Sequence, residues 1–253
     1  MYFCAQRKYW ILLDILIYEL NDYTMRTFSP DDENNKKLVD FLKKLGLSAS
    51  EIKTVTNTEI EFKKGENVCK QGSFASYIMI LKEGWLMSFV ENIHFKSTVF
   101  KITKPFSIIG LSCLYGDNHY HFGCQAITSS KVCLVERVVF DDIIRTNNKF
   151  ASEIIRMYSN SLQNLYDRLN SISNKQSLSK VCDSLIYLSE KIFESNVIPI
   201  IITRRDIAEL SGLATENIVR ILAELKSANA ISVNKKEITI LDMDMLKRFS
   251  CFG

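Results

Sequence analysis

The stretch ITRRDIAELSGLATENIVRILAELKSANAISVNKKEITI, residues 202–240, has the pattern of two short helices followed by a hairpin. Thr203 can cap the first helix, with Asp206 three residues later in the arrangement of a capping box. Gly212 stands where a tight turn between two helices needs a positive φ. A second helix is predicted over 215–226, so the stretch predicts a helix-turn-helix.

The second helix of this pair presents polar side chains near its start and away from its apolar side. They are Thr215, Glu216, Asn217 and Arg220. Such positions of a helix-turn-helix enter the major groove of DNA. Glu216 can accept a hydrogen bond from a cytosine amino group, and Arg220 can donate two hydrogen bonds to a guanine. The alternative is an exposed ion pair between the two, worth roughly 0.2 to 0.5 kcal/mol.

Beyond the helix pair, residues 230–233 and 237–240 alternate around a polar tip. This pattern predicts a β-hairpin, or wing. Lys235 and Lys236 occupy the tip and offer two ammonium groups to a phosphate backbone. Such contacts position a protein on DNA without reading its sequence.

The long segment 150–173 contains neither Gly nor Pro. Its apolar residues follow a strict heptad pattern, which favours a parallel dimer of two helices. The alternative is that this face packs on its own chain. The residues of this predicted dimer seam are Ile155, Tyr158, Leu162, Leu165, Leu169 and Ile172.

From Glu59 to about Val139, short apolar alternations are separated by turns, which is typical of a small β-sandwich or barrel. Within it, FKKGENVCKQGSFASYIMILKEG (62–84) resembles the start of the cyclic-nucleotide-binding β-roll. The order of roll, long helix and wing, over residues 38–245, resembles the CRP/FNR superfamily of transcription regulators.

The resemblance implies an α+β fold with a jelly-roll-like β-roll sensor, a long dimerisation helix and a C-terminal winged helix-turn-helix. We expect an N-terminal extension (1–37), the effector domain (38–147), the dimerisation helix (148–175) and the DNA-binding domain (176–253). The resemblance also implies base reading by Glu216 and Arg220 and backbone contacts by Thr203 and Arg204. The position of Thr215 differs between branches of the superfamily, which leaves the half-site sequence open.

The phosphate-binding cassette of the roll departs from the pattern of cyclic-AMP binders. Leu111 stands where that pattern has a glutamate for the ribose, and no arginine occurs between Arg26 and Arg137. We therefore do not expect cyclic AMP, because its phosphate would lack a cationic partner. The effector stays unknown, and we place its pocket near Gly110 and Leu111.

The segment IGLSCLYGDNHYHFGCQAITSSKVCLVE (109–136) is closer to the oxygen-sensing branch of the superfamily. Cys133 lies in the local setting of one iron-sulfur ligand of that branch. The other ligands normally lie near the N-terminus, where only Cys4 occurs, so a four-thiolate cluster is not expected. His119 and His121 would point to one side of a strand and could suit haem or a metal, or be plain surface residues. We include both histidines and Cys133 in the candidate effector pocket and expect no metal site.

Composition limits the remaining possibilities. The 253 residues include 32 Lys and Arg against 29 Asp and Glu, an excess too small to indicate DNA binding by itself. Seven scattered cysteines indicate reduced thiols of a cytoplasmic protein. No catalytic constellation appears, so an enzyme is not expected.

The apolar segment 10–20 is too short and too charged to span a membrane. It could form an amphipathic extension, or translation could begin at Met25. We predict a cytoplasmic homodimer that binds double-stranded DNA, responds to a small-molecule or redox effector and has RNA polymerase as a partner. The alternative is a ligand-sensing module that acts through a protein partner and not through DNA.

Overall fold

The computed structural model describes residues 25–26, 33–93 and 97–251. Cys4 and the apolar segment 10–20 lie outside the described residues. Helix α2 (Glu33–Lys44) crosses the predicted boundary between residues 37 and 38. It buries Leu38 and Leu42 in the same core as strands of the roll, so we propose that the effector domain includes all of this helix.

Two antiparallel sheets form the roll. One has the strand order β1-β2-β9-β4-β7 and the other β3-β8-β5-β6. The strands are β1 (Met25–Arg26), β2 (Glu59–Phe62), β3 (Asn67–Cys69), β4 (Tyr77–Glu83), β5 (Leu86–Glu91), β6 (Ser97–Thr103), β7 (Ser107–Ile109), β8 (Gly123–Ala126) and β9 (Ser130–Glu136). The predicted β-roll is confirmed.

Alternation along the strands separates two cores. In β4, Met79 and Leu81 face the core between the two sheets, whereas Ile78 and Ile80 face helices outside the first sheet. Successive side chains of a strand point to opposite faces, so a continuous apolar run fits a strand buried on both sides. The turn after β4 needs Gly84, where φ is 86° and a Cβ would lie 2.2 Å from Ser130 Oγ.

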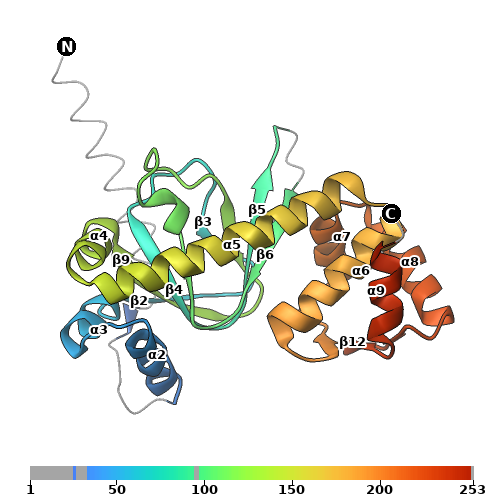
Figure 1. Ribbon diagram of the computed structural model, residues 1–253, viewed down its shortest axis with the longest axis horizontal. Coiled ribbons are helices and arrows are strands. Elements are labelled where there is room, and N and C mark those ends of the chain that lie inside the picture. Colours follow the sequence, from blue (N-terminus) through green and yellow to red (C-terminus); the bar gives the residue numbers. More distant parts are fainter. Residues whose placement is uncertain (1–24, 27–32, 94–96, 252–253) are drawn as a thin grey trace.

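Helices cover the outer face of the first sheet and connect it to the rest of the chain (Figure 1). They are α2, α3 (Ala49–Val55), α4 (Arg137–Thr146) and the long α5 (Asn148–Asn174), while the short 3₁₀ turn η1 (Leu111–Cys113) follows β7. Asn147 caps α5, its side chain accepting a hydrogen bond from the backbone nitrogen of Phe150 at 3.0 Å. Phe150 then packs against Phe140 of α4, which fixes α5 to the roll.

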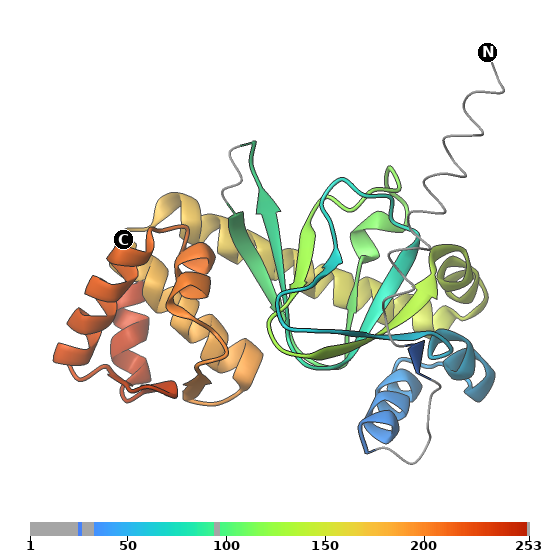
Figure 2. The ribbon, with the colours of Figure 1, turned by 180° about the vertical axis from the view of Figure 1, so that it is seen from behind.

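The last third forms a helical domain at the far end of α5 (Figures 1 and 2). Its elements are α6 (Ser177–Tyr187), the π-helical turn η2 (Leu188–Phe193), β10 (Val197–Pro199), α7 (Arg204–Ser211), α8 (Thr215–Ser227), β11 (Ile231–Val233), β12 (Glu237–Ile240) and α9 (Met243–Cys251). The predicted helix pair and wing hairpin are present. Strand β10 also pairs with β12, which makes the wing sheet three-stranded.

Among the described residues, no helix combines the length and the apolar character that crossing a membrane requires.

Candidate DNA-binding interface and effector cavity

The first helix of the pair, α7, has the predicted capping box. The Thr203 hydroxyl accepts from the Asp206 backbone nitrogen at 3.1 Å, and the Asp206 carboxylate accepts from the Thr203 backbone nitrogen at 2.7 Å. The helix ends at Gly212 with φ 65°. A Cβ at Gly212 would lie 3.1 Å from Ile172 Cγ2, so the turn packs closely on α5.

The second helix, α8, separates an inner from an outer face as expected. Its buried residues are Ile218, Ile221, Leu222 and Leu225. The four predicted base-reading residues, Thr215, Glu216, Asn217 and Arg220, are all exposed. Ala214 supplies no side-chain cap, so the amides at the start of α8 are left without one.

The ion pair that the sequence offered as an alternative is not the one that forms. Arg220 Nη1 lies 3.7 Å from Glu224 Oε2, one turn further along, and the described residues contain no Glu216–Arg220 pair. Both side chains of the observed pair are more than half exposed. Such a pair contributes little, so Arg220 can exchange Glu224 for a base edge at small cost.

The predicted backbone contacts lie beside this face. Arg204 at the start of α7 is exposed, and so are Lys235 and Lys236 at the wing tip. The side chain of Asn234 accepts from the backbone nitrogens of Lys236 and Glu237, which holds the tip in one shape. The Thr203 hydroxyl, in contrast, is already engaged with Asp206 as donor and acceptor.

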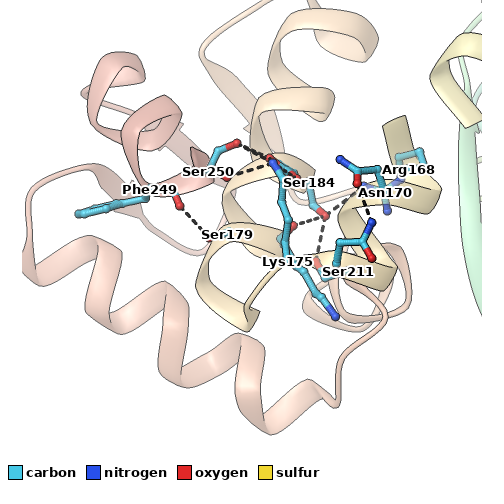
Figure 3. Close-up of polar contacts among 11 residues, drawn as sticks. Arg168, Asn170, Lys175, Ser179, Ser184, Ser211, Phe249 and Ser250 are labelled. Atoms are coloured by element: carbon cyan, nitrogen blue, oxygen red, sulfur yellow. Dashed lines mark hydrogen bonds and ion pairs between the residues drawn. The ribbon is translucent and has the colours of Figure 1, made fainter. Parts of the chain in front are cut away.

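A buried arginine ties the C-terminal DNA-binding domain, residues 176–251 and called the reader below, to α5 (Figure 3). Arg168 is 5% exposed, and its guanidinium donates to the carbonyl of Leu210, lies 3.5 Å from the Ser184 hydroxyl and 5.7 Å from the centre of the Tyr187 ring. Ser184 is also within 2.9 Å of the Ser211 hydroxyl. This network joins α5, α6 and α7, so a shift of α5 should carry the helix-turn-helix with it.

A second link attaches the reader to the roll. Tyr187 lies with its hydroxyl 3.1 Å from the backbone nitrogen and 3.3 Å from the carbonyl of Ile102. Ile102 belongs to β6, the edge strand of its sheet, whose outward backbone groups lack a neighbouring strand. Around this contact, Met87, Val99 and Ile102 of the roll share one apolar cluster with the reader.

Most residues of the predicted dimer seam are exposed to solvent. Five of its residues are exposed by 36 to 67%: Ile155, Tyr158, Leu162, Leu165 and Leu169. Ile172 differs, because it is half-buried against the turn at Gly212 of its own chain. A row of large exposed apolar side chains is typical of an interaction surface.

A cavity of about 530 Å³ lies between the roll, α5 and the start of the reader. Gly110, Leu111 and His121 of the predicted pocket line it, together with Tyr158, Leu162 and Leu165 of the seam. The same three helix residues thus border the cavity and the open face of α5. The cavity and the predicted dimer seam therefore share these three side chains.

Two residues predicted for the pocket lie elsewhere. The His119 ring packs edge-on against Phe74 at 5.9 Å, while His121 Nε2 lies 2.9 Å from Asp117, so the histidines do not form a shared ligand pair. Cys133 is fully buried in β9. The expectation that His119 and Cys133 line the pocket is wrong, because strand alternation turns Cys133 into the core beneath the helices.

The described residues also do not fit an iron-sulfur cluster. Burial raises the pKa of the Cys133 thiol to about 12, which favours the thiol over the thiolate that binds metal. No group of three or more His, Cys, Asp or Glu in the described part of the chain could hold a metal ion.

The prediction from the sequence considered only arginine as a cationic partner in the pocket, and it missed lysines. Lys101 of β6 lines the cavity, and so do Lys104 and Lys191. Lys104 pairs with Glu194, and Lys191 is exposed. The pairing of Lys101 with Ser88, beside a register shift in β6, places it on the inner face of the roll.

Comparison with known proteins agrees with this architecture. A cyclic nucleotide-binding domain matches residues 59–147, and a Crp-like helix-turn-helix domain matches residues 179–249. The chain belongs to the CRP/FNR superfamily of transcription regulators. Members of this superfamily are DNA-binding regulators and not enzymes.

Individual relatives of this CRP/FNR regulator are distant in sequence. The fumarate and nitrate reduction regulatory protein of Vibrio cholerae is 25% identical, covering 71% of this chain and 73% of its own length. Electron transport regulator A of Shewanella oneidensis is 24% identical over similar shares, 71% and 73%. Among solved structures, FixK2 of Bradyrhizobium japonicum has a TM-score of 0.71 at 19% identity, covering 78% of this chain and 98% of its own.

Proposed function

We propose that this regulator binds a pseudo-palindromic DNA site as a homodimer, and that an effector or redox signal other than cyclic AMP controls the binding. The observation that carries the proposal is the exposed polar face of α8 on a helix pair whose apolar side is fully buried. Half-sites about one helical turn apart follow from two-fold symmetry.

In this account, Glu216 and Arg220 read base edges, with Thr215 and Asn217 beside them. Arg204, Lys235 and Lys236 contact the phosphate backbone, and Thr203 primarily caps α7. The residues from 178 to the end carry ten basic and ten acidic side chains, so non-specific attraction to DNA is weak. Specific binding then depends on base contacts and on the avidity of two linked readers.

The open face of α5 supports the homodimer. Pairing of two such helices would cover Leu162, Leu165 and Leu169, which a single chain leaves exposed. Because Arg168 ties α5 to the reader, the position of the paired helices sets the spacing of the two α8 helices. An effector that moves α5 would thereby change affinity for DNA.

The absence of a carboxylate at Leu111 supports an effector other than cyclic AMP, since the ribose hydroxyls lose their usual acceptor at that position. We place the protein in the cytoplasm with RNA polymerase as a partner. The domain limits that we propose are 148–175 for the dimerisation helix and 176–253 for the reader, with the effector domain ending at 147.

Selection of bound fragments from genomic DNA by the purified protein, with and without exposure to air, tests the proposal. We expect enrichment of one pseudo-palindrome whose half-sites are about one helical turn apart. Recovery of fragments without a shared motif would contradict the proposed function. A difference between the two air conditions would indicate a redox signal, and identical results would argue against one.

A further inference from the structure

Lys101 stands on the inner face of the roll. Across the second sheet, Ser88 of β5 pairs with Lys101 of β6 on one side and with Cys124 of β8 on the other. Residues opposite each other in neighbouring strands project to the same face, so the three side chains form one row. Ser88 and Cys124 are buried, and Ser88 and Lys101 line the cavity.

The ammonium group of Lys101 has no anionic partner among the described residues. Two other lysines do have one: Lys82 lies 2.5 Å from Glu59 in the interior, and Lys104, which also lines the cavity, pairs with Glu194. Lys101 is half-buried, and burial lowers its pKa because the charged form loses part of its hydration. A partly desolvated cation without a counter-charge is costly, and an anion in the cavity would relieve that cost.

A second polar group of the same strand also lacks a partner. Thr103 is 1% exposed and lines the cavity, and its hydroxyl has no hydrogen-bond partner among the described residues. Lys101 and Thr103 are two residues apart in a strand and therefore share a face. Buried hydroxyl groups are normally hydrogen-bonded. Lys101 and Thr103 therefore offer one cation and one hydroxyl to a ligand.

The rest of the cavity wall is mainly apolar. Phe100, Ile108, Leu111, Phe122 and Leu162 contribute to it. A volume of about 530 Å³ falls within the range of sites for small ligands. The Lys101 ammonium group, on the inner wall among apolar side chains, suits a ligand with one negative charge and an apolar body.

We propose that this cavity binds a small organic monoanion, a carboxylate with an apolar body, whose charged group pairs with Lys101 and accepts from the Thr103 hydroxyl. The site lies on the strand that Tyr187 joins to the reader, because Ile102 stands between Lys101 and Thr103. The proposal names the effector class of the proposed function and rests on that function only for its effect on DNA binding.

Calorimetric titration of the full chain tests the site. The probes are monocarboxylates from benzoate to dodecanoate, each with its uncharged primary amide, and cyclic AMP. The proteins are the wild type, Lys101→Met, which keeps an unbranched stem without the charge, and Lys64→Met as the control. Lys64 is exposed at the turn between β2 and β3. Thermal unfolding verifies that each variant is folded.

We expect at least one carboxylate to bind the wild type and Lys64→Met equally and to bind Lys101→Met at least about tenfold more weakly, as loss of a charge-assisted hydrogen bond predicts. Its amide should bind all three proteins with the weaker affinity. The proposal would be overturned if the carboxylates bound the wild type and Lys101→Met equally, or if an acid and its amide bound equally. It would also be overturned if no probe bound, or if cyclic AMP bound more tightly than every carboxylate.

DNA binding of the same three proteins, without added probe, is measured separately. If none of the three proteins bound DNA, the proposed function would be contradicted. The titrations would still test the carboxylate site independently. Normal DNA binding combined with carboxylate affinities that do not depend on Lys101 would contradict the site alone.

Discussion

The Tyr187 hydroxyl lies 3.1 Å from the backbone nitrogen of Ile102 and 3.3 Å from its carbonyl oxygen. One phenol thus satisfies both outward backbone groups of a residue on the edge strand β6. The inner face of the same strand lines the cavity through Lys101 and Thr103. Only Ile102 separates the two cavity-lining residues of β6, so we expect a change of β6 inside the roll to affect α6 through the Tyr187 contact.

Tyr187→Phe should remove this link while keeping the ring on which Arg168 rests. The buried backbone groups of Ile102 would lose their partner, so we expect the free energy of unfolding to fall by about 1 kcal/mol. DNA affinity should also respond less to a bound carboxylate. Denaturant unfolding and DNA titration measure the two effects. Tyr166→Phe, at an exposed position of α5, is the control, and an equal response in both variants would contradict the link.

Leu162→Glu combined with Leu165→Glu should produce monomers. Charged side chains in the middle of an apolar helix seam oppose pairing, and both residues are exposed in the single chain, so the fold should persist. Sedimentation velocity measures the mass. Gln163→Glu adds one of these charges on the neighbouring outward face and should leave a dimer. A double variant that stays dimeric would contradict the seam.

The buried thiols should resist alkylation in the native protein. Burial raises the pKa of Cys124, Cys133 and Cys182 to about 12, so almost no thiolate is present at neutral pH. Cys251 is exposed. Among the described cysteines, we expect iodoacetamide to modify Cys251 alone, and Cys251→Ser to remove that product. Peptide mass spectrometry locates the label, and fast native labelling of Cys133 would contradict its placement in the core.

Lys101→Met should stabilise the ligand-free protein in a pH-dependent way. Burial lowers the native pKa of Lys101 from its ordinary value of 10.5, although the nearby Cys124 raises it in part. Between the lowered value and 10.5, the unfolded chain holds a proton that the native chain has lost, so wild-type stability rises with pH.

The advantage of Lys101→Met in free energy of unfolding should therefore be largest at neutral pH and shrink as the pH approaches 10.5. Denaturant unfolding at several pH values measures it, with Lys64→Met as the variant that should show no such trend. If the difference in free energy of unfolding between Lys101→Met and the wild type stayed constant or grew with pH, Lys101 would be solvent-exposed and not on the inner face of the roll.

The helix-turn-helix could be predicted almost residue by residue because its signals are local. The capping box of Thr203 and Asp206 and the positive φ of Gly212 depend on the chain nearby, and the structure has both. Strand alternation likewise predicted the roll and the hairpin.

The residues that line the cavity could not be predicted in the same way. Cys133 and His119 were assigned by position in a resembling segment, whereas burial and ring packing decide where they lie. Lys101 was missed because only an arginine was considered as the partner of a cyclic phosphate. Its inward placement follows from the pairing of β6 with β5, a contact between strands that the sequence of either one does not reveal.

The central claim is that α8 reads bases through Arg220, and binding of Arg220→Ala to a library randomised at every half-site position tests it most directly. The control is Arg145→Ala, an exposed arginine of α4 that pairs with Asp141. We predict a loss of about 1 to 3 kcal/mol on the best site together with relaxed preference at one guanine. An equal loss across all base variants, or no loss beyond that of the control, would contradict the account.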